Sequence, residues 1–147
     1  MDDPFDLKRF VTAQEGCFDG VIEELRNGYK QGHWIWFIFP QLEGLGMSWR
    51  SNHYGISSLA EATQYLQHPV LGARLIECTK LVNAVQGRSA LTIFGGTDAM
   101  KFRSSMSLFS MADPHCHEFK YALEKYFDGQ ADPLTLKMLA KNSKAGA

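Results

Sequence analysis

The fold is decided by one stretch of sequence, His33-Trp34-Ile35-Trp36-Phe37-Ile38-Phe39-Pro40-Gln41. Its apolar run before Pro40 fits a buried strand and a buried helix equally well, because periodicity does not separate the two in so short a run. If the stretch is helical, one face carries Trp34, Phe37, Ile38 and Gln41. A buried amide on such a face could bind a planar ligand while the rings stack on it. Alternatively, the rings pack the core and Gln41 satisfies backbone groups freed near Pro40.

Helical periodicity dominates on both sides of this block. Apolar residues recur at intervals of three and four, as in Leu71, Leu75, Cys78 and Val82. Asp-Pro pairs at 3–4, 113–114 and 132–133 mark helix starts, and Ser58 with Glu61 forms a capping box. We therefore predict an all-α fold, a compact single domain of about seven or eight helices over residues 4–141. We expect orthogonal packing rather than a simple up-down bundle, with residues 142–147 as a disordered tail.

The totals narrow the class of protein. A chain of 147 residues suits one domain with its own core. The net charge of −1 gives no electrostatic case for a nucleic-acid partner, and the longest apolar run is too short to span a membrane. The three scattered cysteines, Cys17, Cys78 and Cys116, indicate free thiols in a reducing compartment. We expect a cytoplasmic protein without a membrane partner, and nothing in the sequence calls for a cofactor.

Two glycine-containing segments could bind an anion. Gly44-Leu45-Gly46-Met47-Ser48 could form a backbone concavity with Arg50 close behind, but the third glycine of a dinucleotide motif is missing and we prefer a flexible turn. Gly95-Gly96-Thr97-Asp98 precedes a predicted helix, where free N–H groups favour an anion. Because Asp98 already complements the helix dipole, we prefer an N-terminal cap there.

Four further residues have a chemical and a structural interpretation. Lys101 and Ser105 are one helical turn apart and could form a Lys-activated nucleophile, or Lys101 pairs with Asp98 on the surface and Ser105 bonds its own backbone. Arg74 interrupts an apolar stripe, so it either meets an anion or extends to solvent at the edge of the stripe. His33 could act as an acid or base only with a partner that the sequence does not reveal.

The triplet His115-Cys116-His117 resembles a metal cluster only in composition. On a helix, side chains two residues apart point about 200° apart and cannot share one ion. A zinc site also needs further ligands at suitable spacing, and the chain has no Cys-x-x-Cys pair. We predict no metal site.

Several motifs together carry a family resemblance. They are residues 32–41 and 44–48, then Tyr54, Glu61-Ala62, Tyr65-Leu66, His68-Pro69, Leu71-Gly72, Arg74-Leu75, Ile93-Phe94-Gly95, Asp98, Lys101 and Ser104-Ser105-Met106. From about Phe5 to Leu139 the chain resembles a bacterial family of unknown function, number 1810 in the series of such domains. The resemblance implies a mainly helical fold, favours a helix for the aromatic block and implies no established activity. Members are often given the name calpastatin automatically, but calpastatins are long and disordered, whereas this chain is compact and aromatic.

Two functions follow as expectations. The first is a pocket for a small planar anionic ligand, such as a nucleotide, built from Trp34, Gln41, the 44–48 loop, Tyr54 and Arg74. Its candidates for chemistry are His33, Asp98, Lys101 and Ser105, with no catalytic residue assigned. The second is a non-catalytic structural or protein-interaction module, as a homodimer. Polar groups converging on a cleft would favour the first, and an apolar surface patch over a dry core would favour the second.

Overall fold

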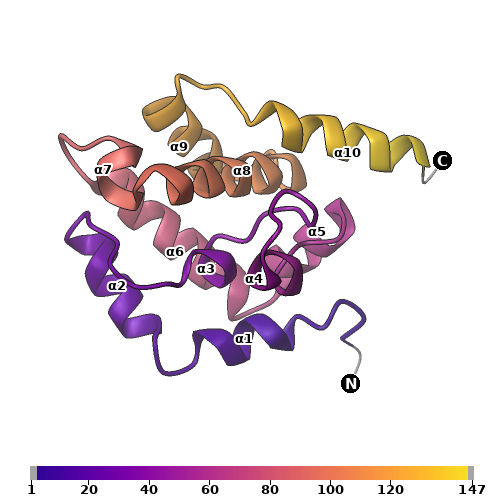
Figure 1. Ribbon diagram of the computed structural model, residues 1–147, viewed down its shortest axis with the longest axis horizontal. Helices are drawn as coiled ribbons and strands as arrows, with labels where there is room; N and C mark the ends of the chain where they lie inside the picture. The colour runs from indigo at the N-terminus through magenta and orange to yellow at the C-terminus, as the bar shows by residue number, and fades with distance from the viewer. Residues whose placement is uncertain (1–2, 146–147) are drawn as a thin grey trace.

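The chain is all-helical, as predicted. The computed structural model describes residues 3–145, with side chains through Lys141, and this part forms ten helices and no strand. In order (Figure 1) they are α1 (Lys8–Gln14), α2 (Phe18–Arg26), α3 (Ile35–Ile38), α4 (Trp49–His53), α5 (Leu59–Gln67), α6 (Leu71–Ala84), α7 (Ala90–Phe94), α8 (Gly96–Ala112), α9 (His117–Phe127) and α10 (Pro133–Ala145). The count exceeds the predicted seven or eight because α3, α4 and α7 are single turns, too short to leave a periodic signature.

The three Asp-Pro pairs act differently from one another. Only α10 begins at its proline. Helix α1 begins at Lys8, not at Pro4, because Asp6 takes a left-handed conformation (φ +53°) and inserts a turn. Asp3 still caps this helix, since its carboxylate accepts from the backbone N–H groups of Leu7 at 2.8 Å and Lys8 at 3.0 Å. Helix α9 likewise begins three residues after its Asp-Pro pair, at His117.

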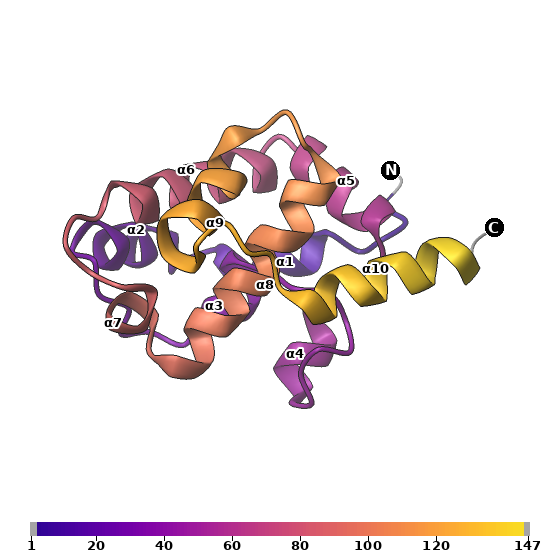
Figure 2. The same ribbon diagram turned by 90° about the horizontal axis from the view of Figure 1, so that it is seen from above.

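Helix α10 continues through Ala145, past the point where the tail was predicted to begin at residue 142. Residues 146 and 147 of that predicted tail lie outside the described residues. Figures 1 and 2 show α10 running outward from the rest of the molecule.

Helix α8 lies at the centre of the packing, in contact with α5, α9, α7, α10 and α3 (Figure 2). Its apolar stripe, formed by Phe102, Met106 and Phe109, is fully buried. The Phe102 ring packs edge-on against Phe39 at 4.9 Å between centroids and stacks on Phe94 at 4.7 Å. A single core cluster extends from Leu7 to Leu139, so the helices share one interior.

The aromatic block is partly helix and partly extended. Residues 35–38 form the one-turn helix α3, and the chain then extends through Phe39 (ψ 72°). Pro40 explains the change, because a proline disfavours the helical conformation in the residue before it. Beyond it, Ile56 N–H donates to Gln41 O at 2.9 Å and Glu43 N–H to Ile56 O at 2.8 Å, which forms an isolated parallel bridge. This bridge fixes the backbone of Gln41 against the segment that precedes α5.

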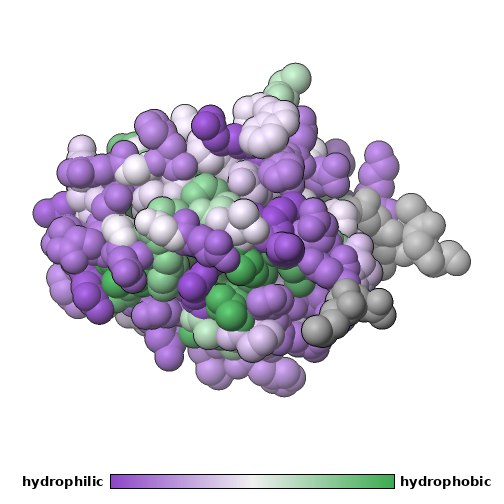
Figure 3. Space-filling view, turned by 90° about the horizontal axis from the view of Figure 1, so that it is seen from below, coloured by the Kyte–Doolittle hydropathy of each residue, from purple (hydrophilic) through white to green (hydrophobic). Residues whose placement is uncertain are grey.

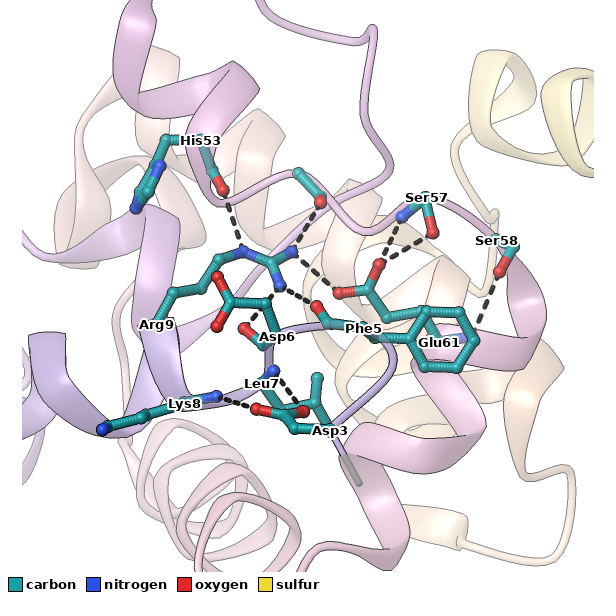
Figure 4. A network of polar contacts seen from close by, with 11 residues as sticks. Asp3, Phe5, Asp6, Leu7, Lys8, Arg9, His53, Ser57, Ser58 and Glu61 are labelled. Carbon is teal, nitrogen blue, oxygen red and sulfur yellow. Dashed lines mark hydrogen bonds and ion pairs between the residues drawn. The ribbon is translucent and has the colours of Figure 1, made fainter. Parts of the chain in front are cut away.

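A buried ion pair ties α1 to α5 (Figure 4). Arg9 Nη2 lies 2.7 Å from Glu61 Oε2, and the side chains are 11% and 3% exposed. The other N–H groups of Arg9 donate to backbone carbonyls of Phe5, Asp6, His53 and Gly55. Glu61 also accepts from the N–H and hydroxyl of Ser57 through Oε1. In the predicted capping box, Ser58 Oγ accepts from Glu61 N–H as expected, but the Glu61 carboxylate bonds Ser57 instead of Ser58.

Candidate functional site

A groove of about 390 Å³ lies between the segment 41–51 and the N-terminal half of α8. We call it the α8 groove. One wall is formed by Gln41, Leu45, Gly46, Met47, Ser48 and Ser51. The other is formed by Thr97, Met100, Lys101 and Ser104, and the start of α10 closes one side with Asp132 and Leu134.

The α8 wall is a single helical face. Thr97, Met100, Lys101 and Ser104 are spaced i, i+3, i+4 and i+7, which places their side chains in adjacent rows. With a rise of 1.5 Å per residue, this face is about 10 Å long. It begins in the first turn of α8, where the unpaired N–H groups of the helix produce a positive potential.

The opposite wall is held in place by close local contacts. Ser48 caps α4, because its Oγ accepts from Ser51 N–H at 3.1 Å. A Cβ at Gly46 would overlap Ser51 Oγ, so only glycine fits where the loop crosses this serine. Gly44 has φ +94°, a conformation that glycine adopts without strain. The two predicted glycines therefore shape this wall of the groove.

Gln41 supplies the most informative group. Its residue is 8% exposed, and its carboxamide makes no hydrogen bond within the described part of the chain. The buried side-chain atoms without a partner in the described range belong to Trp36, Asn83 and Ser105, so the polar atoms of the Gln41 amide face the open groove. Because Gln41 lines the groove, the open hydrogen-bonding positions of its amide are available to a molecule bound there.

Positive charge exceeds negative charge near the start of α8. Asp98 accepts ion pairs from Lys30 at 2.7 Å and from Lys101 at 3.4 Å. Lys101 also lies 5.1 Å from the centroid of the Trp36 ring, and the Arg50 guanidinium lies 5.3 Å from the same centroid. Asp98 thus pairs with two cations, and the third, Arg50, lies near the Trp36 ring, which leaves this end suited to an anion.

At the opposite end of the groove, only one of the two carboxylate oxygens of Asp132 accepts hydrogen bonds from the described residues. Asp132 Oδ2 accepts from Ser104 Oγ and Thr135 N–H, both at 3.1 Å, and from Thr135 Oγ1 at 2.5 Å. Asp132 Oδ1 accepts from no group between residues 3 and 141. The cap of α10 accounts for one oxygen and leaves the other free.

Of the sequence-predicted residues, Gln41, Gly46, Ser48 and Lys101 line the groove. Asp98 adjoins it through Lys101, and Gly44 lies in the same loop, where a Cβ would contact Met138 Cε at 3.3 Å. The remaining predicted residues lie elsewhere.

Trp34 and His33 lie outside the groove. The Trp34 ring is buried, and its Nε1 donates to Glu24 Oε1 at 3.1 Å. Burial raises the pKa of the Glu24 carboxyl, but donation from Gly32 N–H, Gln31 N–H and the Trp34 indole outweighs it, so the pKa is lowered overall. His33 is exposed at the surface.

Tyr54 and Arg74 pack around α1 and α2. The Tyr54 ring contacts Phe10 and Phe37. Arg74 Nη1 donates to Gln14 Oε1 at 3.1 Å, and its guanidinium lies 4.6 Å from the Phe18 ring. Arg74 therefore meets an amide and an aromatic ring, the partners that explain its place on an apolar stripe.

Ser105 is fully buried, and its Oγ has no partner among the described residues. A nucleophile there would have no contact with a substrate. Asn83 Oδ1 is another buried atom without a described partner, beside a cavity of about 270 Å³ whose lining includes His117, Glu118 and Tyr121. The Nδ2 of Asn83 bonds Glu118, so that side chain is already oriented by the protein.

Sequence reasoning missed Ser51, Thr97, Met100, Ser104, Asp132 and Leu134 as parts of one site. Asp132 was interpreted only as a helix start, which is also correct. Residues 97, 100, 101 and 104 share a helical face, a signal that the sequence does contain. The face could not be assigned to a groove before its partner segment was known.

Two other cavities contain polar groups that the protein already pairs. One, of about 610 Å³, lies between α1 and the turn before α6, where His68 Nδ1 accepts from the N–H groups of Val70 and Leu71. The other, of about 470 Å³, borders the Arg9–Glu61 pair. Figure 3 shows the face on the side of α1 and α2, where hydrophilic side chains surround apolar ones near the centre.

No group of three or more His, Cys, Asp or Glu side chains in the described range could hold a metal ion. Cys17, Cys78 and Cys116 are free thiols. Among the described helices, none is long and apolar enough to cross a bilayer.

Comparison with known proteins identifies the family. The chain matches the model described as "Protein of unknown function (DUF1810)" over residues 4–139. It is similar to the crystal structure of the conserved hypothetical protein Rv1873 from Mycobacterium tuberculosis, with 56% identity and a TM-score of 0.93, over 94% of this chain and 99% of that one. None of the curated proteins gives a significant match. A match over nearly the whole length shows that the chain belongs to the family of proteins of unknown function DUF1810.

Proposed function

We propose that this protein binds a small planar anionic ligand of the nucleoside monophosphate class in the α8 groove. The observation that carries the proposal is Gln41 on the groove wall, a residue only 8% exposed whose carboxamide bonds no described group and faces the groove. An amide offers two N–H donors and one carbonyl acceptor, which matches the mixed edge of a nucleobase or a carboxamide.

The rim of the groove favours a flat ligand. Met47 is 97% exposed, Leu134 51% and Met100 50%, and all three line the groove. Methionine side chains are flexible and polarizable, so they adjust to the face of a ring at low cost. A polar floor beneath an adaptable apolar rim is typical of small-molecule sites.

The charge near the first turn of α8 favours an anion on that ligand. Lys101 lines the groove, and its ion pair to Asp98 is the longer of the two that Asp98 makes. It is therefore available to a phosphate, for which ammonium and guanidinium groups are common ligands.

Thermal unfolding with AMP, GMP, CMP and UMP tests the proposal. At about one hundred times its dissociation constant, a ligand adds about 2.7 kcal/mol of stability, or roughly 5–10 °C in Tm for a chain of this size. We expect at least one nucleotide to raise the Tm of the wild type, and Gln41→Met and Lys101→Met to abolish the rise. Lys80→Met, an exposed change on α6, should retain it.

The proposal fails if none of the four nucleotides raises the Tm. It also fails if Lys80→Met reduces the response as much as Lys101→Met does, because binding would then depend on overall charge and not on the groove.

Homodimerisation is a second candidate, favoured by two exposed apolar side chains of one segment, Met47 at 97% and Trp49 at 70% exposure. Exposed aromatic and methionine side chains are frequent in interfaces between proteins. Light scattering over a range of concentrations tests this function: a dimer that dissociates in Trp49→Ser supports it, and a monomer throughout excludes it.

A further inference from the structure

The α8 groove has an electrical polarity along its length. Lys101 and Ser104 are adjacent on the same face of α8, separated by about 4.5 Å of helix rise. Because Ser104 Oγ donates to Asp132, the carboxylate lies toward the C-terminal end of this face. Lys101, and Arg50 across the Trp36 ring, lie toward the positive N-terminal end. A ligand that spans the groove must therefore differ between its two ends.

The Oδ1 of Asp132, unpaired among the described residues, determines which chemical groups a ligand must carry at the end that lies near Asp132. A carboxylate oxygen accepts hydrogen bonds and donates none, so it selects N–H or O–H groups. Oδ2 already accepts three hydrogen bonds, and Oδ1 accepts none from residues 3–141. Gln41, on the facing wall, contributes both donors and an acceptor. Together these groups complement a ring edge that presents neighbouring N–H donors beside a carbonyl.

We propose that the ligand is a guanine-type nucleotide, with its two N–H groups on Asp132 Oδ1 and its phosphate near Lys101. Guanine presents a ring N–H, an exocyclic amino group and a carbonyl on one edge. Adenine presents a ring nitrogen lone pair in place of the ring N–H, and a carboxylate repels that lone pair. The inference rests on the proposed function and adds base selectivity to it.

An alternative role for Asp132 is purely structural. As the residue before α10 it caps that helix, and asparagine caps a helix as well as aspartate does. If capping were its entire role, Asp132→Asn would change neither the stability nor the ligand preference. The substitution therefore separates the two roles without removing the cap.

Calorimetric titration with GMP, AMP and XMP tests the inference in the wild type and in Asp132→Asn. In XMP a carbonyl replaces the amino group of guanine, which an asparagine amide can bind and a carboxylate cannot. We expect the wild type to bind GMP at least about tenfold more tightly than AMP or XMP, a ratio typical of one paired hydrogen-bond contact. In Asp132→Asn, GMP should weaken by about tenfold or more and XMP should strengthen.

The matched control is Asp113→Asn, which makes the same change at an aspartate that accepts from His115 N–H at the other end of α8. It should leave all three affinities unchanged. A gain for XMP cannot arise from unfolding, so it supports the inference even if Asp132→Asn lowers the Tm.

Equal binding of GMP and AMP by the wild type, or an unchanged preference in Asp132→Asn, would overturn the inference and leave the proposed function standing. Absence of binding by every nucleotide would overturn both.

Discussion

Two regions of this protein bury polar side chains and differ in how the hydrogen-bonding groups of those side chains are paired. Beside α1, Arg9 and Gln14 have partners within the protein for their polar groups. In the α8 groove, the Gln41 amide and one oxygen of Asp132 have none between residues 3 and 141. Both regions look equally polar in the sequence. The pairing of the polar groups, together with their access to an open groove, separates a structural network from a site that a ligand can complete.

The two buried glutamines, Gln14 and Gln41, show this difference most clearly. Gln14 is 1% exposed, and its Nε2 donates to Phe37 O at 2.8 Å and to Tyr65 Oη at 3.4 Å, while Oε1 accepts from Arg74. Gln41 is 8% exposed and has no such partner in the described range. The same side chain therefore stabilises the fold in one place and is left open in the other.

The largest expected loss of stability comes from removing the Arg9 side chain from its network of hydrogen bonds. Arg9→Met removes the cation from Glu61, which is 3% exposed, and leaves the backbone carbonyls of Phe5, His53 and Gly55 without their side-chain donor. Breaking one side of a buried ion pair costs about 3–5 kcal/mol, which corresponds to a fall in Tm of roughly 6–20 °C. Thermal or denaturant unfolding measures it.

Lys8→Met is the control for Arg9→Met, because it removes a neighbouring but exposed cation. It should change the free energy of unfolding by no more than about 0.5 kcal/mol. Equal stability of Arg9→Met and the control would show that the Arg9 network contributes nothing to the fold.

Gln14→Met is expected to have the next largest effect. Methionine has a similar shape, but it leaves Phe37 O and the Arg74 guanidinium without the partner they have in the wild type. Stranding buried polar groups costs about 1–3 kcal/mol. Urea unfolding with the slope held in common between variants measures the loss, and a variant as stable as the wild type would contradict the assigned role of Gln14.

The sequence allowed the seven longer helices to be predicted because their apolar residues recur over several turns. The single-turn helices α3, α4 and α7 have no such repeat and were not separated from loops. Within the aromatic block, Pro40 was the signal that the helix must stop at Phe39, and it was not used for that purpose. A face calculated for one continuous helix placed Trp34 beside Gln41, whereas the chain turns between them.

The candidate site was predictable in parts. Gln41, Gly46, Ser48 and Lys101 stood out by composition or position, and all four line one groove. Their convergence with Asp132 was not predictable, because the segments 41–51, 97–104 and 132–134 are distant in the sequence. The same reason hid the Arg9–Glu61 pair, whose members are 52 positions apart.

The smallest expected change in stability is also the most direct test of the central claim, that Gln41 is reserved for a ligand. We would measure the free energy of unfolding of Gln41→Met beside that of Gln14→Met, without ligand. Replacing an amide that bonds no described group and faces the groove by an apolar side chain of similar shape should change the stability by no more than about 0.5 kcal/mol, whereas Gln14→Met should lose about 1–3 kcal/mol. If Gln41→Met loses as much as Gln14→Met, the Gln41 amide is part of the fold and the claim is wrong.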